Sequence, residues 1–190
     1  MGATRQRRED RAEVILDAAE ALLRRSGSRT LTIDAVAAEA GLSKGGVLHH
    51  YASKDALVTA LAARKVERMS EGIGACAEAL RGDPAALPLA MIAHARGVYA
   101  EECGFPDSLL VATAENDQAV AIMRGFLDGN LASIRDVEGH EGAGAALLFA
   151  VLGLMMSRSL GFHALEGEEL ERLFSALEAQ ARALPRQRET

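Results

Sequence analysis

The chain has 190 residues, of which 49% are hydrophobic, 25% charged and 4% aromatic, so it can bury a core without metal ions or disulfide bonds. Its two cysteines, Cys76 and Cys103, fit no disulfide framework or zinc spacing, and no apolar stretch follows the first arginines, so we expect a cytoplasmic protein without a signal peptide. The net charge is −6, yet residues 1–70 hold 12 Lys and Arg against 9 Asp and Glu, which favours a polyanion-binding surface near the N-terminus.

The first part of the chain predicts four helices. No segment alternates apolar and polar residues as a strand does, so the fold class is all-α. Apolar residues at helical spacing predict a helix over residues 9–25 and two short helices, over 33–40 and from about 44 to 51. A longer fourth helix follows, over 54–73. The expected capping residues of the last three are Thr32, Ser43 and Ser53.

The remainder of the chain also reads as helical. Turn residues at 81–84, 104–107, 139–142 and 166–167 separate the expected helices. These helices cover residues 86–102, 108–115, 119–137, 142–162 and 168–184. The uncharged stretch 142–157 is too short to cross a membrane, which takes about 20 apolar residues, so we expect no membrane partner.

The two short helices joined at Gly41 form a helix-turn-helix, whose second helix enters the major groove of DNA. They are too short to be stable alone, so the first helix must cover them. With Val47 toward the core and about 100° per residue, Gly45 and His49 point outward. Glycines in a helix cost about 1 kcal/mol each relative to alanine. The Gly45-Gly46 pair therefore indicates close approach to another surface, or else simply a poor first turn.

The stretch from Leu31 to Leu57, preceded by an Ile-x-x-Ala-Ala helix, resembles the TetR-type transcriptional repressors. The resemblance rests on Thr-x-x-x-x-Ala, Gly-Leu-Ser-Lys-Gly, an aromatic at Tyr51 and Ser-Lys-x-x-Leu, over about a quarter to a third of the chain. It implies a three-helix helix-turn-helix domain over residues 1–53. A long fourth helix would join this to a helical ligand-binding and dimerisation domain over 54–190. Independently of the resemblance, Arg5, Arg7 and Arg8 predict that residues 1–8 form a short flexible arm toward the DNA backbone or minor groove.

The resemblance also implies roles for single residues. Phosphate contacts fall to Thr32, Ser43 and Lys54. The residues implied in reading bases are Lys44, Gly45, Gly46 and His49. Tyr51 is implied to lock the third helix to the first.

One position departs from the family pattern. The family usually has a tyrosine at Leu48, so a phosphate contact is lost or is replaced by His49 or His50. The other residues have alternative interpretations without DNA contact. Each serine can serve only as an N-cap, and His49 can be a solvated surface residue. The arm with Arg5, Arg7 and Arg8 can be a disordered chain end.

The C-terminal part offers a candidate dimer interface. Two helices, over about 143–156 and 168–184, would build it, with Gly144 and Gly153 allowing close approach. The alternative is burial of the first of these helices within one subunit. The interface candidates are Leu148, Leu152, Met156, Leu170, Phe174 and Leu177.

The same part offers candidates for an effector pocket, since ligand sites are mostly apolar with a few polar groups. His94 and Tyr99 are the polar candidates, although each candidate can equally be ordinary core. His140 and His163 read as surface residues, and we expect no metal and no cofactor. The pocket candidates are Met91, His94, Tyr99, Phe105, Met123, Phe126, Phe149 and Met155.

These features predict a homodimeric repressor that binds a palindromic double-stranded DNA operator and leaves it when a small-molecule effector binds. An activator of the same family and a helical carrier of small molecules are the alternatives. An enzyme is not expected, because the sequence holds no nucleophile elbow, zinc-protease motif, P-loop or dinucleotide fingerprint, and we assign no catalytic residue.

Overall fold

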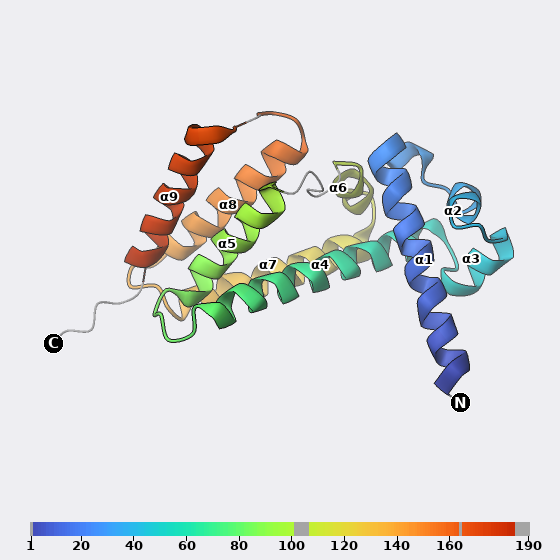
Figure 1. Cartoon of the computed structure of the whole chain (residues 1–190), viewed down its shortest axis with the longest axis horizontal. Helices are drawn as coiled ribbons and strands as arrows, with labels where there is room; N and C mark the ends of the chain where they lie inside the picture. Colours follow the sequence, from blue (N-terminus) through green and yellow to red (C-terminus); the bar gives the residue numbers. More distant parts are fainter. Residues whose placement is uncertain (1, 101–106, 164, 185–190) are drawn as a thin grey trace. The chain divides into compact units, whose positions relative to one another are not determined.

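The computed structural model describes residues 2–100, 107–163 and 165–184, with side chains from Asp10 on in the first helix and from Leu109 on in the sixth. Over these ranges the chain is helical and contains no strand, which confirms the predicted fold class (Figure 1). The elements are α1 (Gly2–Ser26), the short 3-10 helix η1 (Ser28–Thr30), α2 (Ile33–Glu39), α3 (Lys44–His50), α4 (Lys54–Ala79), α5 (Ala86–Ala100), α6 (Asp107–Ala114), α7 (Asp117–Arg135), α8 (Ala143–Ser159) and α9 (Gly167–Ala183).

Each predicted helix is present, and the ends differ by a few residues in most cases. The largest difference is at the N-terminus. The stretch expected to be a flexible arm, residues 1–8, is helical from Gly2 on, so α1 is longer than the apolar pattern alone indicates. That pattern starts at Val14, because the first turns of α1 carry no apolar face.

The chain divides into two compact units. Unit 1 comprises residues 1–65 and 106–123, and unit 2 comprises residues 66–105 and 124–190. Helices α4 and α7 each contribute residues to both units. Unit 1 therefore extends beyond the expected N-terminal domain, residues 1–53, because it also takes in α6 and the ends of two long helices.

In unit 1, α1 covers the helix-turn-helix, as the shortness of α2 and α3 requires. Ile15 of α1, Val36 of α2, Val47 of α3 and Leu57 of α4 are all fully buried. Burying a side chain of this size contributes roughly 1.5–3 kcal/mol. Gly41 ends α2 with a φ of +65°, a left-handed conformation that side-chain-bearing residues rarely adopt.

Helix α6 packs against α1 and η1, within unit 1. Asn116, which follows α6, is buried and links it to the start of α4. Its Nδ2 donates to the carbonyl oxygen of Asp55 at 2.9 Å, and its Oδ1 accepts from the backbone N–H of Ala119 at 2.8 Å. Both polar ends of the buried amide are thus satisfied, and the junction of α6 with α7 is fixed to the first turn of α4.

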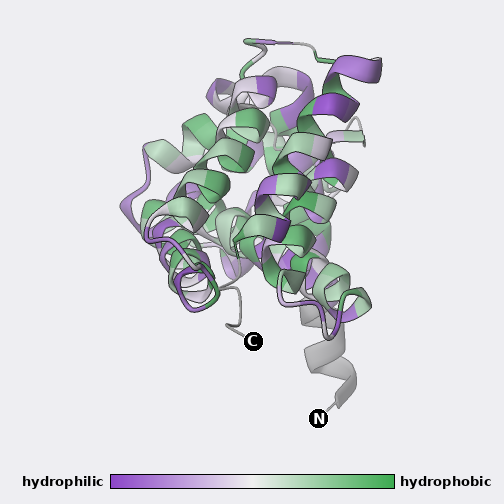
Figure 2. Ribbon diagram, turned by 90° about the vertical axis from the view of Figure 1, so that its left-hand side faces the viewer, coloured by the Kyte–Doolittle hydropathy of each residue, from purple (hydrophilic) through white to green (hydrophobic). Residues whose placement is uncertain are grey.

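Unit 2 contains a second core, built by α5, α8 and α9. Phe174 of α9 is completely buried there, in the same cluster as Ile92 and Tyr99 of α5 and Val151 of α8. Hydrophobic and hydrophilic residues lie side by side on most helices in Figure 2, as expected where one helix face is buried and another meets solvent.

Candidate nucleic-acid interface

Three helices of unit 1 begin at exposed hydroxyl side chains. The Thr32 Oγ1 accepts from the backbone N–H of Ala35 at 3.1 Å, and the Ser43 Oγ accepts from that of Gly46 at 3.1 Å. The Ser53 Oγ does the same for Ala56 at 3.0 Å. These are the predicted N-caps of α2, α3 and α4. A capped N-terminus still presents further N–H groups and the positive end of the helix dipole, which favour a phosphate.

Helix α3 buries one side and exposes the other. Val47 is fully buried, whereas Lys44, Gly45, Leu48 and His49 are exposed, as the wheel predicts for Gly45 and His49. His50 is half-buried, and its ring meets that of His49 edge-on at 5.5 Å between centroids.

The two glycines of α3 differ in their surroundings. A Cβ added at Gly45 would meet nothing within 4 Å among the residues that the structure describes, so no contact with them requires a glycine there. A Cβ at Gly46 would lie 3.3 Å from the capping Ser43 Oγ. The N-cap contact thus favours a small residue at Gly46, whereas no such contact accounts for Gly45 in the described part of the chain.

Two lysines on this part of unit 1 have partners within the chain. Lys44 Nζ lies 2.9 Å from Asp34 Oδ2 of α2, an ion pair that joins the two helices of the helix-turn-helix. Lys54 Nζ donates to the carbonyl oxygen of Ser28 at 3.4 Å. Both contacts are solvent-exposed, so a phosphate can replace them at small cost.

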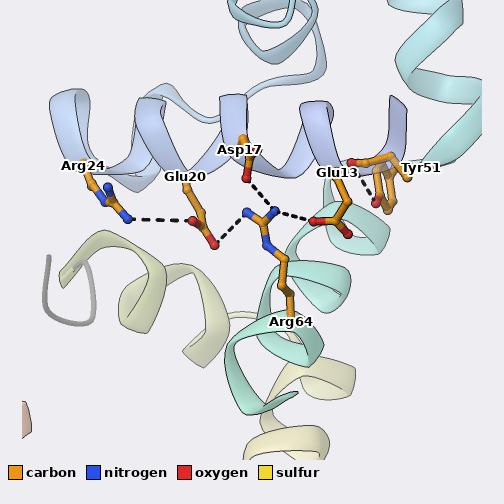
Figure 3. A network of polar contacts seen from close by, with 7 residues as sticks. Glu13, Asp17, Glu20, Arg24, Tyr51 and Arg64 are labelled. Carbon is orange, nitrogen blue, oxygen red and sulfur yellow. Dashed lines mark hydrogen bonds and ion pairs between the residues drawn. The ribbon is translucent and has the colours of Figure 1, made fainter. Parts of the chain in front are cut away.

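Tyr51 lies at the end of α3 and contacts α1, as the resemblance implies. Its hydroxyl donates to the carbonyl oxygen of Ala12 at 3.5 Å, a long hydrogen bond (Figure 3). Burial raises the pKa of the Tyr51 hydroxyl, the negative charge of Glu13 adds to this rise, and Arg64 opposes it. Tyr51 thus stays neutral at physiological pH and acts as a donor.

A buried arginine ties α4 to α1. Arg64 is 6% exposed, and its guanidinium points at three carboxylates on one face of α1 (Figure 3). The distances are 3.0 Å to Glu13, 2.8 Å to Asp17 and 2.8 Å to Glu20. Burial alone would lower the pKa of Arg64, but hydrogen bonds and charges from Glu13, Glu20 and Asp17 outweigh it and raise the pKa above its ordinary value.

A further ion pair lies at the surface of the same unit. Arg25, near the end of α1, donates two hydrogen bonds to the Glu39 carboxylate at the end of α2, at 3.2 and 2.7 Å. The hydrogen bond from Arg25 lowers the pKa of Glu39, with a smaller opposing effect of desolvation, and the same contact raises the pKa of Arg25.

The structure separates the predicted dimer-interface residues into two groups. Phe174 and Leu177 are 0% and 4% exposed and belong to the core of unit 2, so these two predictions are corrected: within one chain α5 and α8 already cover them. Leu148, Leu152 and Leu170 are half-buried, and Met156 is 38% exposed. The predicted close approach at Gly144 is to Ile134 of the same chain, whereas Gly153 is exposed with open space around it.

The predicted pocket residues differ in how deeply they are buried. Met91 and Tyr99 are buried, and the Tyr99 hydroxyl donates to the carbonyl oxygen of Leu165 at 2.9 Å, so Tyr99 is a satisfied core residue. Phe149 is 51% exposed on α8, which corrects its assignment to a pocket. Phe105 lies outside the described residues. The half-buried candidates are His94, Met123, Phe126 and Met155.

His94 has one close neighbour of note. A Cβ added at Gly72 of α4 would collide with the His94 imidazole, so the glycine makes room for the ring. His163, expected at the surface, is half-buried and lies 3.3 Å from the carbonyl oxygen of Leu154. Among the described residues no group of three metal-binding side chains comes together. No helix in the same ranges is long and apolar enough to span a membrane.

Three residues of unit 1 that form contacts between helices were not predicted from the sequence: Asp34, Arg64 and Asn116. Arg64 and Asn116 make contacts across more than 45 positions of the chain, which helical periodicity does not encode. An available signal for Arg64 was the row of acidic residues Glu13, Asp17 and Glu20, spaced along one helix face.

Comparisons with known proteins agree with this architecture. A family model described as "Bacterial regulatory proteins, tetR family" matches residues 15–61, and one described as "Tetracyclin repressor-like, C-terminal domain" matches residues 85–182, about half of the chain. A search of curated proteins found no match.

Several solved structures share the fold. SCO4454, a TetR-family transcriptional regulator from Streptomyces coelicolor, is 19% identical with a TM-score of 0.73, over 97% of this chain and 96% of that one. The SmeT–triclosan complex is 20% identical with a TM-score of 0.66, over 94% and 93%. NalD, the secondary repressor of the MexAB-OprM multidrug efflux pump in Pseudomonas aeruginosa, is 21% identical with a TM-score of 0.58, over 95% and 99%. With a helix-turn-helix in unit 1 and both family models matched, the chain belongs to the TetR family and is a DNA-binding transcriptional regulator, not an enzyme.

Proposed function

We propose that this regulator is a cytoplasmic homodimeric repressor that binds a palindromic operator and is released by a small-molecule effector. The observation that carries the DNA-binding part is the set of three exposed, capped helix N-termini in the unit that also exposes the outer side of α3. Such N-termini bind phosphates, and a helix with one exposed face fits the major groove.

Within the proposed interface, Thr32, Ser43 and Lys54 hold phosphates and His50 supplies a further contact. Four residues in the first turns of α3, named at the end of this paragraph, read bases, because they lie on or beside the outward side of the helix. Gly45 lets the helix backbone approach the groove floor. Tyr51 acts indirectly, through its hydrogen bond to α1. The proposed base-reading residues are Lys44, Gly45, Gly46 and His49.

The proposed dimer forms through the outer side of α8. Phe149 and Met156 of α8 and Leu160, directly after it, are 51%, 38% and 37% exposed, an unusual set of large apolar side chains at the surface of one chain. A second copy is the occupant we propose, because two symmetric half-sites require two copies. The glutamate variant Met156→Glu is expected to sediment as a monomer, while Val111→Glu, at an exposed apolar residue of α6, stays dimeric. If both variants sediment as dimers, the interface does not include the outer side of α8.

The proposed effector is a small, largely apolar molecule bound by unit 2. SmeT, which shares the fold, was solved with triclosan, a compound of this kind. His94 is the polar side chain that we propose orients the ligand, because it is half-buried beside Gly72 and an apolar ligand site uses a few polar groups for orientation. Effector release requires that the ligand favour the conformer that does not bind DNA, and a tenfold preference supplies only about 1.4 kcal/mol.

Selection of genomic DNA by the purified protein tests this function. Fragments are retained at near-physiological salt with excess nonspecific competitor DNA and then sequenced. We expect a few fragments that share an inverted repeat, and run-off transcription from them that falls when the protein is added. Increased transcription would make the protein an activator. Absence of any enriched fragment would contradict sequence-specific binding and favour a helical carrier.

A further inference from the structure

The ion pair between Asp34 and Lys44 joins α2 to α3 on the proposed DNA-binding side. The two charged atoms are 2.9 Å apart, and the side chains are 69% and 59% exposed. An exposed pair of this kind contributes only about 0–1 kcal/mol to folding. Val36 of α2 and Val47 of α3 are fully buried, so each helix is already anchored in the core of unit 1. The stability of the fold therefore gives little reason for the pair.

The positions of the two charges point to the ligand of this surface. Lys44 is the first residue of α3, where a cation opposes the positive end of the helix dipole. Asp34 lies in the first turn of α2, two residues after the capping Thr32. A carboxylate there repels a phosphate that approaches the N-terminus of α2. The pair thus places a cation near the groove and an anion near the backbone contacts.

We propose that Asp34 is a specificity-determining residue, which holds the Lys44 ammonium for base contacts and withholds it from phosphates. The inference rests on the proposed DNA interface. An ammonium has three donors, so one can remain on Asp34 while the others reach the O6 and N7 acceptors of a guanine. A phosphate contact instead draws Lys44 away and leaves the carboxylate facing the DNA backbone. Asp34 therefore weakens binding to arbitrary DNA more than binding to the operator.

The test compares Asp34→Asn with a matched control, Asp55→Asn. Asp55 is the second residue of α4 and follows the capping Ser53, as Asp34 is the second residue of α2 and follows Thr32. Both aspartates are exposed, and in the described part of the chain no ion pair is formed by Asp55. Each variant removes one negative charge from a helix N-terminus, and only Asp34→Asn releases Lys44.

Affinity is measured by fluorescence anisotropy for a random-sequence duplex and for the recovered operator, over a series of salt concentrations. Asp34→Asn is expected to bind the random duplex about threefold more tightly per bound protomer, with a salt slope steeper by about 1. Operator affinity changes less, so the ratio of the two affinities falls. Asp55→Asn leaves this ratio unchanged. An unchanged ratio in Asp34→Asn, or an equal change in Asp55→Asn, would overturn the proposal.

Lys44→Gln keeps the proposal testable if Asp34→Asn folds poorly by circular dichroism. With Asp34 intact, Lys44→Gln should weaken operator binding and leave random-duplex binding almost unchanged. A random-duplex affinity that falls as much as operator affinity would show that Lys44 already serves phosphates, against the proposal. If the parent protein selects no operator, the proposed function fails, and the random-duplex series alone still decides whether Asp34 restrains Lys44.

Discussion

Arg64 Nη2 lies 2.8 Å from Glu20 Oε1, and the two side chains are only 6% and 13% exposed. Glu13 and Asp17 bind the same guanidinium but are 61% and 66% exposed, so water screens them. The Arg64–Glu20 contact is therefore the part of the cluster least accessible to solvent. It fixes α4 to α1, which in turn carries the helix-turn-helix.

Replacing Arg64 by methionine should destabilise unit 1. The change leaves Glu20 poorly solvated beside an apolar side chain, and we expect a loss of on the order of 1–3 kcal/mol in the free energy of unfolding. Urea denaturation measures it. Arg29→Met, at an exposed residue of η1 in the same unit, should change stability by less than about 0.5 kcal/mol. Equal losses in both variants would assign no special role to Arg64.

The Arg25–Glu39 pair predicts a pH dependence. The pKa of Glu39 is lower in the folded protein than in the unfolded chain, so its stabilisation is present above the unfolded value and is lost as the pH falls through the folded one. The difference in Tm between the parent and Glu39→Gln should therefore be small and positive at neutral pH, begin to fall as the pH approaches about 4, and vanish at still lower pH. Glu67→Gln serves as an exposed control. A difference that persists at acid pH would refute this origin.

Lys54→Ala should weaken binding to all DNA alike. The proposed contact is to a phosphate, so the magnitude of the salt slope falls by about 1 per occupied site while sequence preference stays the same. Anisotropy titrations over a salt series measure both quantities. Lys65→Ala, further along α4, is the control with one charge removed. An unaltered slope in Lys54→Ala would remove this residue from the interface.

His49→Ala should alter sequence preference. His49 is exposed on the outward side of α3, and loss of a direct base contact costs roughly 1–3 kcal/mol at one position of each half-site. Selection from an operator library randomised at each position reveals the change. Identical preferences in variant and parent would reduce His49 to a solvated surface residue.

The two glycines of α8 should respond oppositely to alanine. A Cβ at Gly144 would collide with Ile134, so Gly144→Ala overpacks the core and is expected to cost about 1–3 kcal/mol. A Cβ at Gly153 meets nothing within 4 Å, and alanine there should favour the helix by up to about 1 kcal/mol. Chemical denaturation at low protein concentration compares them. Similar effects at both positions would contradict the packing described for Gly144.

The sequence predicted the helices because capping residues, stop glycines and apolar spacing are local signals. Thr32 and Ser43 cap the helices that they were expected to cap, and Gly41 ends α2. The contents of unit 1 were harder to predict, because α6 joins it through contacts such as that of Asn116 with Asp55, far apart in the chain.

In the candidate sites, too, features set by local geometry could be predicted, whereas contacts between distant residues could not. The outward direction of Gly45 and His49 follows from helix geometry, whereas the partner of Lys44 does not. In unit 2 an apolar pattern shows that a face is buried but not what buries it. Phe174 and Leu177 looked suited to a second subunit, and α5 and α8 of the same chain cover them instead.

Hydroxyl-radical footprinting on a selected DNA fragment tests the central claim most directly. If two α3 helices read successive major grooves, the protein should protect two short patches, about 10–10.5 base pairs apart and related by a two-fold axis. Lys54→Ala should lose protection at the sugars that flank one phosphate in each patch. A single patch, or uniform protection along the fragment, would contradict recognition by two helix-turn-helix units.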